Sequence, residues 1–282
     1  MSKCNKTYVV RMIGGLGNQL FQLQYALNFQ RVHGGELQID DSFLAASSKA
    51  HESLAISDLI GSIPQVRLDW FNLKIKRNIE RFFYKLKLRM PNFLNPTYFF
   101  ENSNNDISAM SRVIIDGFWQ NASYLNSEFV QLLRERLKTY SFKNATDHCV
   151  CVHVRRGDYL TNRHWFVKQQ IVVPFSYYEN AFAYFRKILG TPRFEIYTDD
   201  EPWATKIFGN MKDAIVISSV GQMPFELLSK MASYPNYIIA NSTLSWWAAV
   251  ASSPNNKQVV LPKMWGKNMT SDNYCCSDWI AL

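Results

Sequence analysis

An unbroken apolar run at residues 149–152 constrains the fold of this chain more than any other segment. The run Cys-Val-Cys-Val predicts a strand buried on both faces, and such strands are typical of parallel sheets covered by helices. The charged sequence His153-Val154-Arg155-Arg156-Gly157-Asp158 follows at once. Because ligands of open α/β sheets bind beyond the carboxyl ends of strands, this segment predicts an anion site. The arginines would grip a phosphate, as in a nucleotide, although two exposed arginines can also form mere surface ion pairs.

Strands and helices alternate along both halves of the chain. In the first half, residues 8–13 and 36–39 read as strands on either side of a helix that begins at Asn18. Further strands are expected in the second half, at residues 149–154, 194–197, 214–217, 237–240 and 258–261. This alternation predicts an α/β fold with parallel sheets. We expect two facing Rossmann-like domains at residues 1–145 and 146–282, with residues 54–110 helical or irregular.

The composition indicates which kind of partner the protein binds and in which cellular compartment it is found. Hydrophobic residues make up 47% and charged residues 19% of 282, as in a globular protein, and the net charge of +8 favours anionic partners. Neither a signal peptide nor an apolar stretch long enough to cross a membrane is recognisable. Five cysteines without framework spacing indicate reduced thiols, so we expect a cytoplasmic protein.

A glycine-rich turn follows the first strand, in the sequence Gly14-Gly15-Leu16-Gly17-Asn18. It fails the dinucleotide fingerprint G-x-G-x-x-G because position 20 is leucine. Asp40 nevertheless lies about where a ribose-binding acid would, which leaves a nicotinamide-dependent oxidoreductase open. We expect Gly17 and Asn18 to approach a ligand closely.

Two other polar segments lie where strands are expected to end. Asp199 and Asp200 follow Thr198, but the chain has no Asp-x-Asp pair of the kind that holds Mg²⁺ or Mn²⁺, so we expect no metal. In an enzyme that uses a sugar nucleotide without a metal, Arg155 and Arg156 would stabilise the negative charge of the leaving diphosphate. The alternative role for the two aspartates is to cap the N-terminus of a helix. The second segment, Asn241-Ser242-Thr243-Leu244-Ser245, begins a helix whose N-terminus suits phosphate. On the preceding helix, Glu226 would either accept a hydrogen bond from the N–H groups of a guanine base or point into solvent.

The segment from Lys74 to Arg89 carries seven basic residues and one acid, with apolar residues at helical spacing. This pattern predicts a basic amphipathic helix. Two uses stay open for its apolar stripe, because it either packs on its own domain or contacts an anionic membrane. Nucleic acid is a less suitable partner, because no nucleic-acid-binding fold signature accompanies the helix.

Taken together, the motifs resemble the bacterial galactoside alpha-1,2-fucosyltransferases of glycosyltransferase family 11. Four segments match in order: 14–22, 153–159, 197–200 and 238–249. The resemblance implies a GT-B-like fold and inverting, metal-independent transfer of L-fucose from the substrate GDP-beta-L-fucose to O2 of a galactoside, with no cofactor. It implies a glycan acceptor of O-antigen or lipopolysaccharide biosynthesis. Where that acceptor is lipid-linked, the basic helix would bring the enzyme to the inner face of the cytoplasmic membrane.

The resemblance also assigns roles to residues. It implies catalytic roles for Arg155, His153 and Asp158, with Asp158 and His164 as candidate bases. It places donor-binding residues at Gly17, Asn18, Arg156, Asp199, Glu226, Asn241, Ser242, Thr243 and Ser245. The position of Glu226 is more usually Asp in the family. A transferase of another GDP-sugar and a non-catalytic binding protein are the remaining alternatives.

Overall fold

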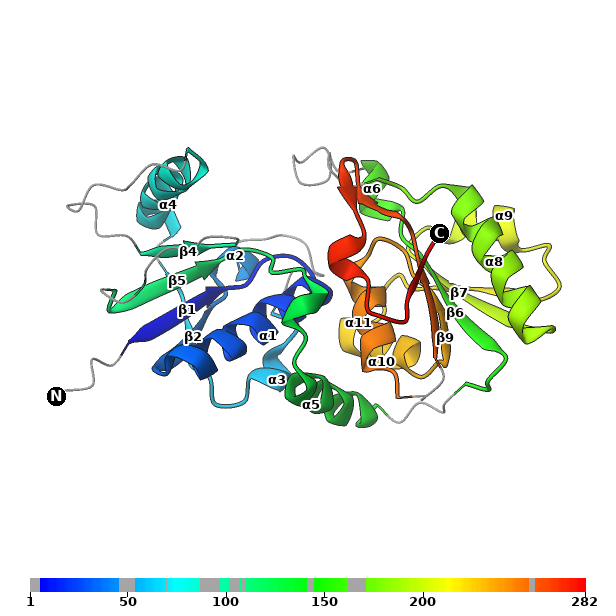
Figure 1. The fold of residues 1–282 in the computed structure, drawn as a ribbon, viewed down its shortest axis with the longest axis horizontal. Helices are drawn as coiled ribbons and strands as arrows, with labels where there is room; N and C mark the ends of the chain where they lie inside the picture. The colour runs from blue at the N-terminus through cyan, green and yellow to red at the C-terminus, as the bar shows by residue number, and fades with distance from the viewer. Residues whose placement is uncertain are drawn as a thin grey trace. The chain divides into compact units, whose positions relative to one another are not determined.

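The computed structural model describes residues 6–45, 54–68, 70–86, 97–101, 107, 110–140, 145–161, 171–253 and 257–282. The chain divides into two compact units, one of residues Met1–Gln120 with Tyr124–Asn126 and one of Asn121–Ser123 with Ser127–Leu282. Each unit has its own parallel sheet with helices on its faces (Figure 1). The expected α/β class, with two Rossmann-like units as in a GT-B-like fold, is confirmed. No helix in the described part of the chain has the length and apolar character needed to cross a bilayer.

The first unit contains a five-stranded sheet in the order β3-β2-β1-β5-β4, and every strand pair in it is parallel. Its elements are β1 (Thr7–Arg11), α1 (Leu16–His33), β2 (Glu36–Asp40), α2 (Ser42–Ala45), α3 (Ser57–Ile60), β3 (Gln65–Val66), α4 (Trp70–Lys85), β4 (Tyr98–Phe100) and β5 (Arg112–Asp116). Residues 54–110 were expected to lack strands, yet they contribute β3 and β4. Both are short, at two and three residues, so neither shows an alternating pattern.

Helices α1 and α4 cover opposite faces of this sheet (Figure 1). Side chains alternate along β1, so Tyr8 packs edge-on against Phe29 of α1, whereas Val9 joins a cluster with Tyr98 and Phe100 on the α4 side. Helix α1 ends where Gly34 adopts a φ of 68° and its N–H donates to Gln30 O at 2.8 Å. That left-handed conformation suits glycine, because other residues meet steric cost there.

The second unit contains a six-stranded parallel sheet in the order β13-β10-β9-β6-β7-β8. Its elements are α5 (Ser127–Lys138), β6 (Cys149–Val154), α6 (Gly157–Thr161), α8 (Phe175–Leu189), β7 (Arg193–Thr198), α9 (Glu201–Phe208), β8 (Ala214–Ser218), α10 (Pro224–Ala232), β9 (Asn236–Ile238), α11 (Thr243–Ala251), β10 (Gln258–Leu261), β11 (Met264–Gly266), β12 (Met269–Thr270) and β13 (Ile280–Ala281). A small antiparallel pair, β11 with β12, lies outside the large sheet.

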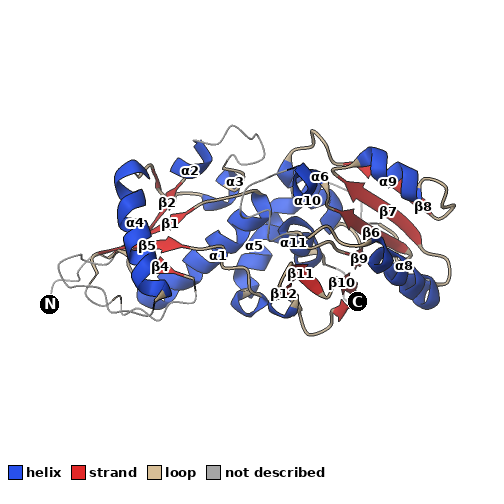
Figure 2. Ribbon diagram, turned by 90° about the horizontal axis from the view of Figure 1, so that it is seen from above, coloured by secondary structure: helices blue, strands red, loops and turns tan. Residues whose placement is uncertain are grey.

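Strand β6 is buried along its whole length, as its apolar run predicts. Val150, Val152 and Val154 point into one core with α8 and α9, whose members include Phe182 and Phe208. Helices α10 and α11 lie on the other side of the sheet (Figure 2). His153 alternates with those valines, so its side chain belongs to the opposite face.

Helix α5 belongs to the second unit, although the sequence analysis set the domain boundary after residue 145. Ser229 Oγ of α10 donates to Leu137 O at 2.9 Å. From α5, Arg134 donates to the carbonyls of Val250, Ala251 and Ser252 at the end of α11. The division therefore falls near residues 120–127, because α5 buries its apolar face in the second unit. Residues 141–144, between α5 and β6, lie outside the described part of the chain.

Candidate active site

Two of the predicted segments meet where the strand order of the second sheet reverses. From β6 the chain continues to β7 and β8 on one side, and later enters β9, β10 and β13 on the other side. Ligands of doubly wound sheets bind at such a switch point, beyond the carboxyl ends of the strands. Arg155 follows β6 and Asn241 closely follows β9, so both lie at this edge. Tyr159 joins the segments, because its hydroxyl donates to Asn241 O at 3.0 Å.

Arg155 is held between two carboxylates. Its Nη2 lies 2.8 Å from Asp158 Oδ1, and its Nη1 lies 2.8 Å from Asp199 Oδ2. The arginine side chain keeps 29% of its surface exposed. A guanidinium has five N–H donors, so two ion pairs fix its plane and leave donors for a ligand. Asp158 and Asp199 thus orient the arginine that was expected to bind phosphate.

Arg156 points into a different environment. Its Nε donates to Asp200 Oδ2 at 3.0 Å, and its guanidinium stacks over the ring of Trp203 at 3.9 Å from the centroid. Asp200 also caps α9 by accepting the N–H of Trp203 at 3.3 Å. The capping interpretation of Asp200 is therefore confirmed. Arg156 is anchored as part of the scaffold by contacts that the sequence did not show, because Trp203 lies on another element.

The backbone between the two motifs is closely packed. The N–H of Arg156 donates to Asp199 Oδ1 at 2.8 Å. A Cβ placed on Gly157 would lie 3.0 Å from Asp199 Oδ2. Glycine at this position therefore lets the end of β6 approach Asp199 closely.

His153 is buried, with 3% of its surface exposed. Burial lowers the pKa of this imidazole from 6.5 to about 4; Asp199 opposes the shift and Arg155 adds to it. The ring is therefore neutral near pH 7. Its Nδ1 is buried with no hydrogen-bond partner among the described residues. A neutral imidazole with such a low pKa is a poor general base, but its N–H can donate a hydrogen bond.

The N-terminus of α11 lies beside this cluster. Ser242 is its N-cap residue, in extended conformation and without a side-chain capping bond. Asn241 is 1% exposed, and its Nδ2 donates to Ile171 O and Trp265 O, at 2.8 and 3.0 Å. Its Oδ1 is buried with no partner in the described part of the chain. At the other end, Arg134 and Lys257 bind the last carbonyls of α11. Backbone N–H groups at the helix start suit an anion.

Two of the residues predicted to bind the donor already have protein partners for their polar atoms. Ser245 is fully buried and donates to Ser242 O at 3.1 Å, so its hydroxyl serves the first turn of α11. Glu226, in the first turn of α10, pairs with Lys230 of the same helix at 2.9 Å. Trp246 and Trp247 are fully buried and pack in the core, so neither ring faces a ligand at this edge.

The glycine-rich turn lies in the first unit, at the switch point between β1 and β5. Gly14 has a φ of 77°, and a Cβ there would lie 2.4 Å from Asn18 Nδ2. Gln120 Nε2 donates to Asn18 Oδ1 at 2.8 Å, and Gln19 Nε2 donates to Gly14 O at 2.8 Å. Gly17 is already inside α1. The polar residues of this motif therefore hold the turn in shape.

Asp40 is committed to a buried ion network rather than to a ribose. It is 2% exposed, lies 3.7 Å from Arg11, and accepts the N–H groups of Ser42 and Leu68. Arg11 also pairs with Asp116 at 3.4 Å, and Asp116 with Arg77 of α4. This geometry removes the residue on which the nicotinamide alternative depended.

The family follows from comparison with known proteins. The profile described as Glycosyl transferase family 11 matches residues 2–282. The chain belongs to glycosyltransferase family 11. Two Escherichia coli relatives are each 27% identical: the O-antigen biosynthesis glycosyltransferase WbnK, over 95% of this chain and 98% of the relative, and an alpha-1,2-colitosyltransferase, over 97% and 98%. The crystal structure of fucosyltransferase NodZ from Bradyrhizobium has a TM-score of 0.48 at 14% identity, over 86% of this chain and 93% of NodZ.

One residue of the matched segment 153–159, Tyr159, has a place in the site of this family 11 glycosyltransferase that sequence reasoning did not assign. Tyr159 bridges the two strand ends, and its ring lies 5.7 Å from the Arg155 guanidinium. Burial raises its pKa above the ordinary range of a tyrosine, so its hydroxyl stays protonated. Its membership in the matched segment was visible in the sequence, but its contact with Asn241 was not.

The acidic residues of the enzyme do not form a metal site in the part of the chain that is described. No group of three or more His, Cys, Asp or Glu side chains there is placed to hold an ion. Asp158, Asp199 and Asp200 instead engage Arg155 and Arg156. His164, a candidate base, lies outside the described residues.

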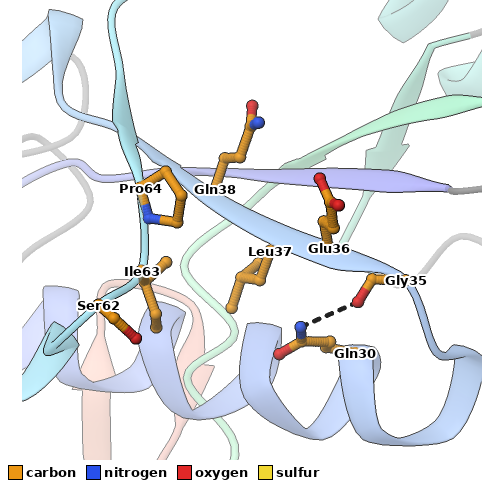
Figure 3. Close-up of a pocket in the computed structure, with 8 residues that line it drawn as sticks. All are labelled: Gln30, Gly35, Glu36, Leu37, Gln38, Ser62, Ile63 and Pro64. Atoms are coloured by element: carbon orange, nitrogen blue, oxygen red, sulfur yellow. Dashed lines mark hydrogen bonds between the residues drawn. The ribbon is translucent and has the colours of Figure 1, made fainter.

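One hollow lies in the first unit of the family 11 enzyme. Its volume is about 260 Å³, and it is lined by Gln30, Gly35, Glu36, Leu37, Gln38, Ser62, Ile63 and Pro64 (Figure 3). It adjoins the amino end of β2, whereas ligands of parallel sheets bind at the carboxyl ends. We therefore assign it no role in transfer.

Proposed function

We propose that this family 11 glycosyltransferase transfers L-fucose from GDP-beta-L-fucose to O2 of a galactoside, with inversion and without a metal ion. The observation that carries the proposal is the meeting of two phosphate-binding elements at one switch point. These are the Arg155 loop after β6 and the N-terminus of α11 after β9. The resemblance of four motifs to alpha-1,2-fucosyltransferases supports the sugar and the linkage.

In this reaction the bond between C1 of fucose and the β-phosphate oxygen breaks, and a bond from the acceptor O2 to C1 forms. Negative charge develops on the departing diphosphate. Arg155 would meet that charge with its free N–H donors, together with backbone N–H groups at the start of α11. The two arginines face three carboxylates, so the helix N-terminus has to supply part of the stabilisation.

The acceptor proton needs a route out of the site. His153 is a weak base because its pKa is lowered to about 4, and Asp158 is engaged with Arg155. A dissociative reaction, in which the sugar already carries positive charge, requires little base catalysis. We therefore propose that the hydroxyl proton leaves late, to solvent on the acceptor side of the sugar, because the departing diphosphate lies on the opposite face in an inverting reaction. His153 would donate a hydrogen bond to the donor.

We propose Thr243 and Ser242 as further phosphate contacts, and Glu226 as a contact of the guanine base. Gly17 and Asn18 stay predictions as donor-binding residues. Ser245 and Asp199 support the site from behind, since their polar atoms are engaged with Ser242 and with Arg155. We also propose a cytoplasmic location and a glycan acceptor of the O-antigen type, because the relative WbnK is described as an O-antigen glycosyltransferase.

Transfer of colitose is the second candidate, because one relative is described as an alpha-1,2-colitosyltransferase. A donor-and-acceptor array, read by mass spectrometry, separates the two. It should pair GDP-fucose and activated colitose with galactosides that carry a free or a blocked O2. We expect fucose on free O2 only. Product from colitose alone would overturn the fucose assignment, and product with blocked O2 would overturn the linkage.

A further inference from the structure

Helix α4 is fixed on the first sheet by its polar face. Arg77 pairs with Asp116 of β5. Glu80 is 4% exposed and accepts the N–H groups of Thr97 and Tyr98, with distances of 3.0 and 2.8 Å to its Oε2. One turn further along, Tyr84 donates to Glu101 O at 3.1 Å. These contacts span Arg77 to Tyr84, so they fix the rotation of the helix about its own axis.

The apolar face of α4 consequently points away from the sheet. Ile75, Ile79 and Phe82 are 61%, 39% and 57% exposed, and Leu86, directly after the helix, is 53% exposed. Their spacing of four, three and four residues places them in one row along the helix. We call these four residues the outer stripe. Helix α5 shows the ordinary arrangement, since it buries Phe129, Val130, Leu133 and Leu137.

Positive charge flanks the outer stripe. Lys85 is exposed, and Arg81 is partly exposed. The segment from Lys74 to Arg89 has seven basic residues, and its single acid, Glu80, is turned into the sheet. The side chain of Lys74 and the residues from Lys87 to Arg89 lie outside the description. Of the described basic residues, Arg77 and Lys76 are turned toward Asp116 and Glu80, whereas Arg81 and Lys85 lie beside the large apolar side chains on the solvent side of α4.

We infer that the outer stripe docks the enzyme on an anionic lipid bilayer. An interfacial helix lies in the membrane plane, with its apolar side chains at the boundary of headgroups and acyl chains. Basic residues beside it are attracted to acidic headgroups. A nucleic acid would use the cations but gives no apolar layer to bury Phe82, and a second copy of this chain would bring the same positive charge. The inference is independent of the sugar that is transferred.

The test is flotation of the full chain with phosphatidylglycerol vesicles and with neutral phosphatidylcholine vesicles. We expect binding to the anionic vesicles that weakens with salt. The double variant Ile79→Ser, Phe82→Ser should lower partitioning about tenfold or more, because it removes apolar area from the contact. Lys85→Gln should lower it about fivefold, the equivalent of one interfacial charge. Both changes are at exposed positions, so the fold should be retained.

The matched controls are Val32→Ser and Lys138→Gln. Val32 is 76% exposed on α1, and the Lys138 side chain is 67% exposed on α5. They should float like the unchanged protein, and all variants should keep the rate of transfer to a soluble acceptor. The inference is overturned if the unchanged protein does not float at low salt, or if the controls lose as much binding. It is also overturned if the stripe variant abolishes a dimer in sedimentation while flotation is unchanged.

Discussion

At the scale of single residues, Arg155, which we propose as the phosphate-binding arginine, is oriented by the same carboxylates that offset its charge. Arg155 contacts Asp158 and Asp199, each at 2.8 Å, and Gly157 leaves room for Asp199 beside the strand end. Such a pair of contacts fixes the guanidinium before a donor arrives, which reduces the cost of ordering it on binding. Preorganisation of this kind favours the transition state over loose donor binding.

The variant Asp199→Asn tests whether Asp199 orients the Arg155 guanidinium or only offsets its charge. The change weakens a charge-assisted contact by about 1 to 1.5 kcal/mol, so we expect kcat to fall about tenfold. Removal of one negative charge should lower or leave unchanged the KM for the donor. Asp213→Asn is the control, because Asp213 pairs with Arg186 on the exposed surface of the same unit. An unchanged kcat in Asp199→Asn would show that Asp199 does not position Arg155.

His153 should make stability depend on pH. Its folded-state pKa is about 4, below the unfolded value of 6.5, so the unfolded chain takes up the proton first as the pH falls. We expect this residue to account for a loss of about 2 kcal/mol of unfolding free energy between pH 7.5 and 5. In urea titrations at pH 7.5 and 5, the unfolding free energy of His153→Gln should fall by about 2 kcal/mol less than that of the unchanged protein. His148→Gln, at an exposed position before the same strand, should behave like the unchanged protein; equal slopes in all three proteins would refute the assignment.

At the scale of elements, α4 is held by hydrogen bonds that a change at one residue can remove. Glu80→Ala would leave the N–H groups of Thr97 and Tyr98 without their carboxylate. We expect about 2 kcal/mol less unfolding free energy, since buried donors lose their partner. Asn78→Ala, on the exposed side of the same helix, should change it by less than about 0.5 kcal/mol. Equal effects of the two changes would contradict the described orientation of α4.

Five of the six strands of the second sheet could be predicted from the sequence, all except the two-residue β13, and the rotation of the helices could not. Apolar runs that end in polar residues marked β6 and β10 to the residue. The stripe of α4 was visible in the sequence, but the choice between burying and exposing it depends on Arg77 and Glu80 finding partners on β4 and β5. Likewise, Asp199 could be recognised as the partner of Arg155 only from the pairing of β6 with β7.

At the scale of the whole molecule, the family and the two parallel sheets support the proposed transfer from a nucleotide-activated sugar. The absence of any Asp-x-Asp pair in the sequence motivates the expectation of metal independence. Transfer rates measured after treatment with EDTA should equal those of the untreated enzyme. Loss of activity on chelation, with recovery on addition of Mn²⁺, would contradict this account of the diphosphate site.

The central claim, that Arg155 at the switch point stabilises the leaving diphosphate, is tested most directly by the rate of fucosyl transfer from GDP-fucose to a galactoside. We expect Arg155→Ala to lower kcat about 10²- to 10³-fold, as for removal of one donor from a transition-state charge. Arg155→Lys should restore little, because an ammonium lacks the planar fork that Asp158 and Asp199 orient. A rate in Arg155→Ala equal to that of the unchanged enzyme would contradict the claim.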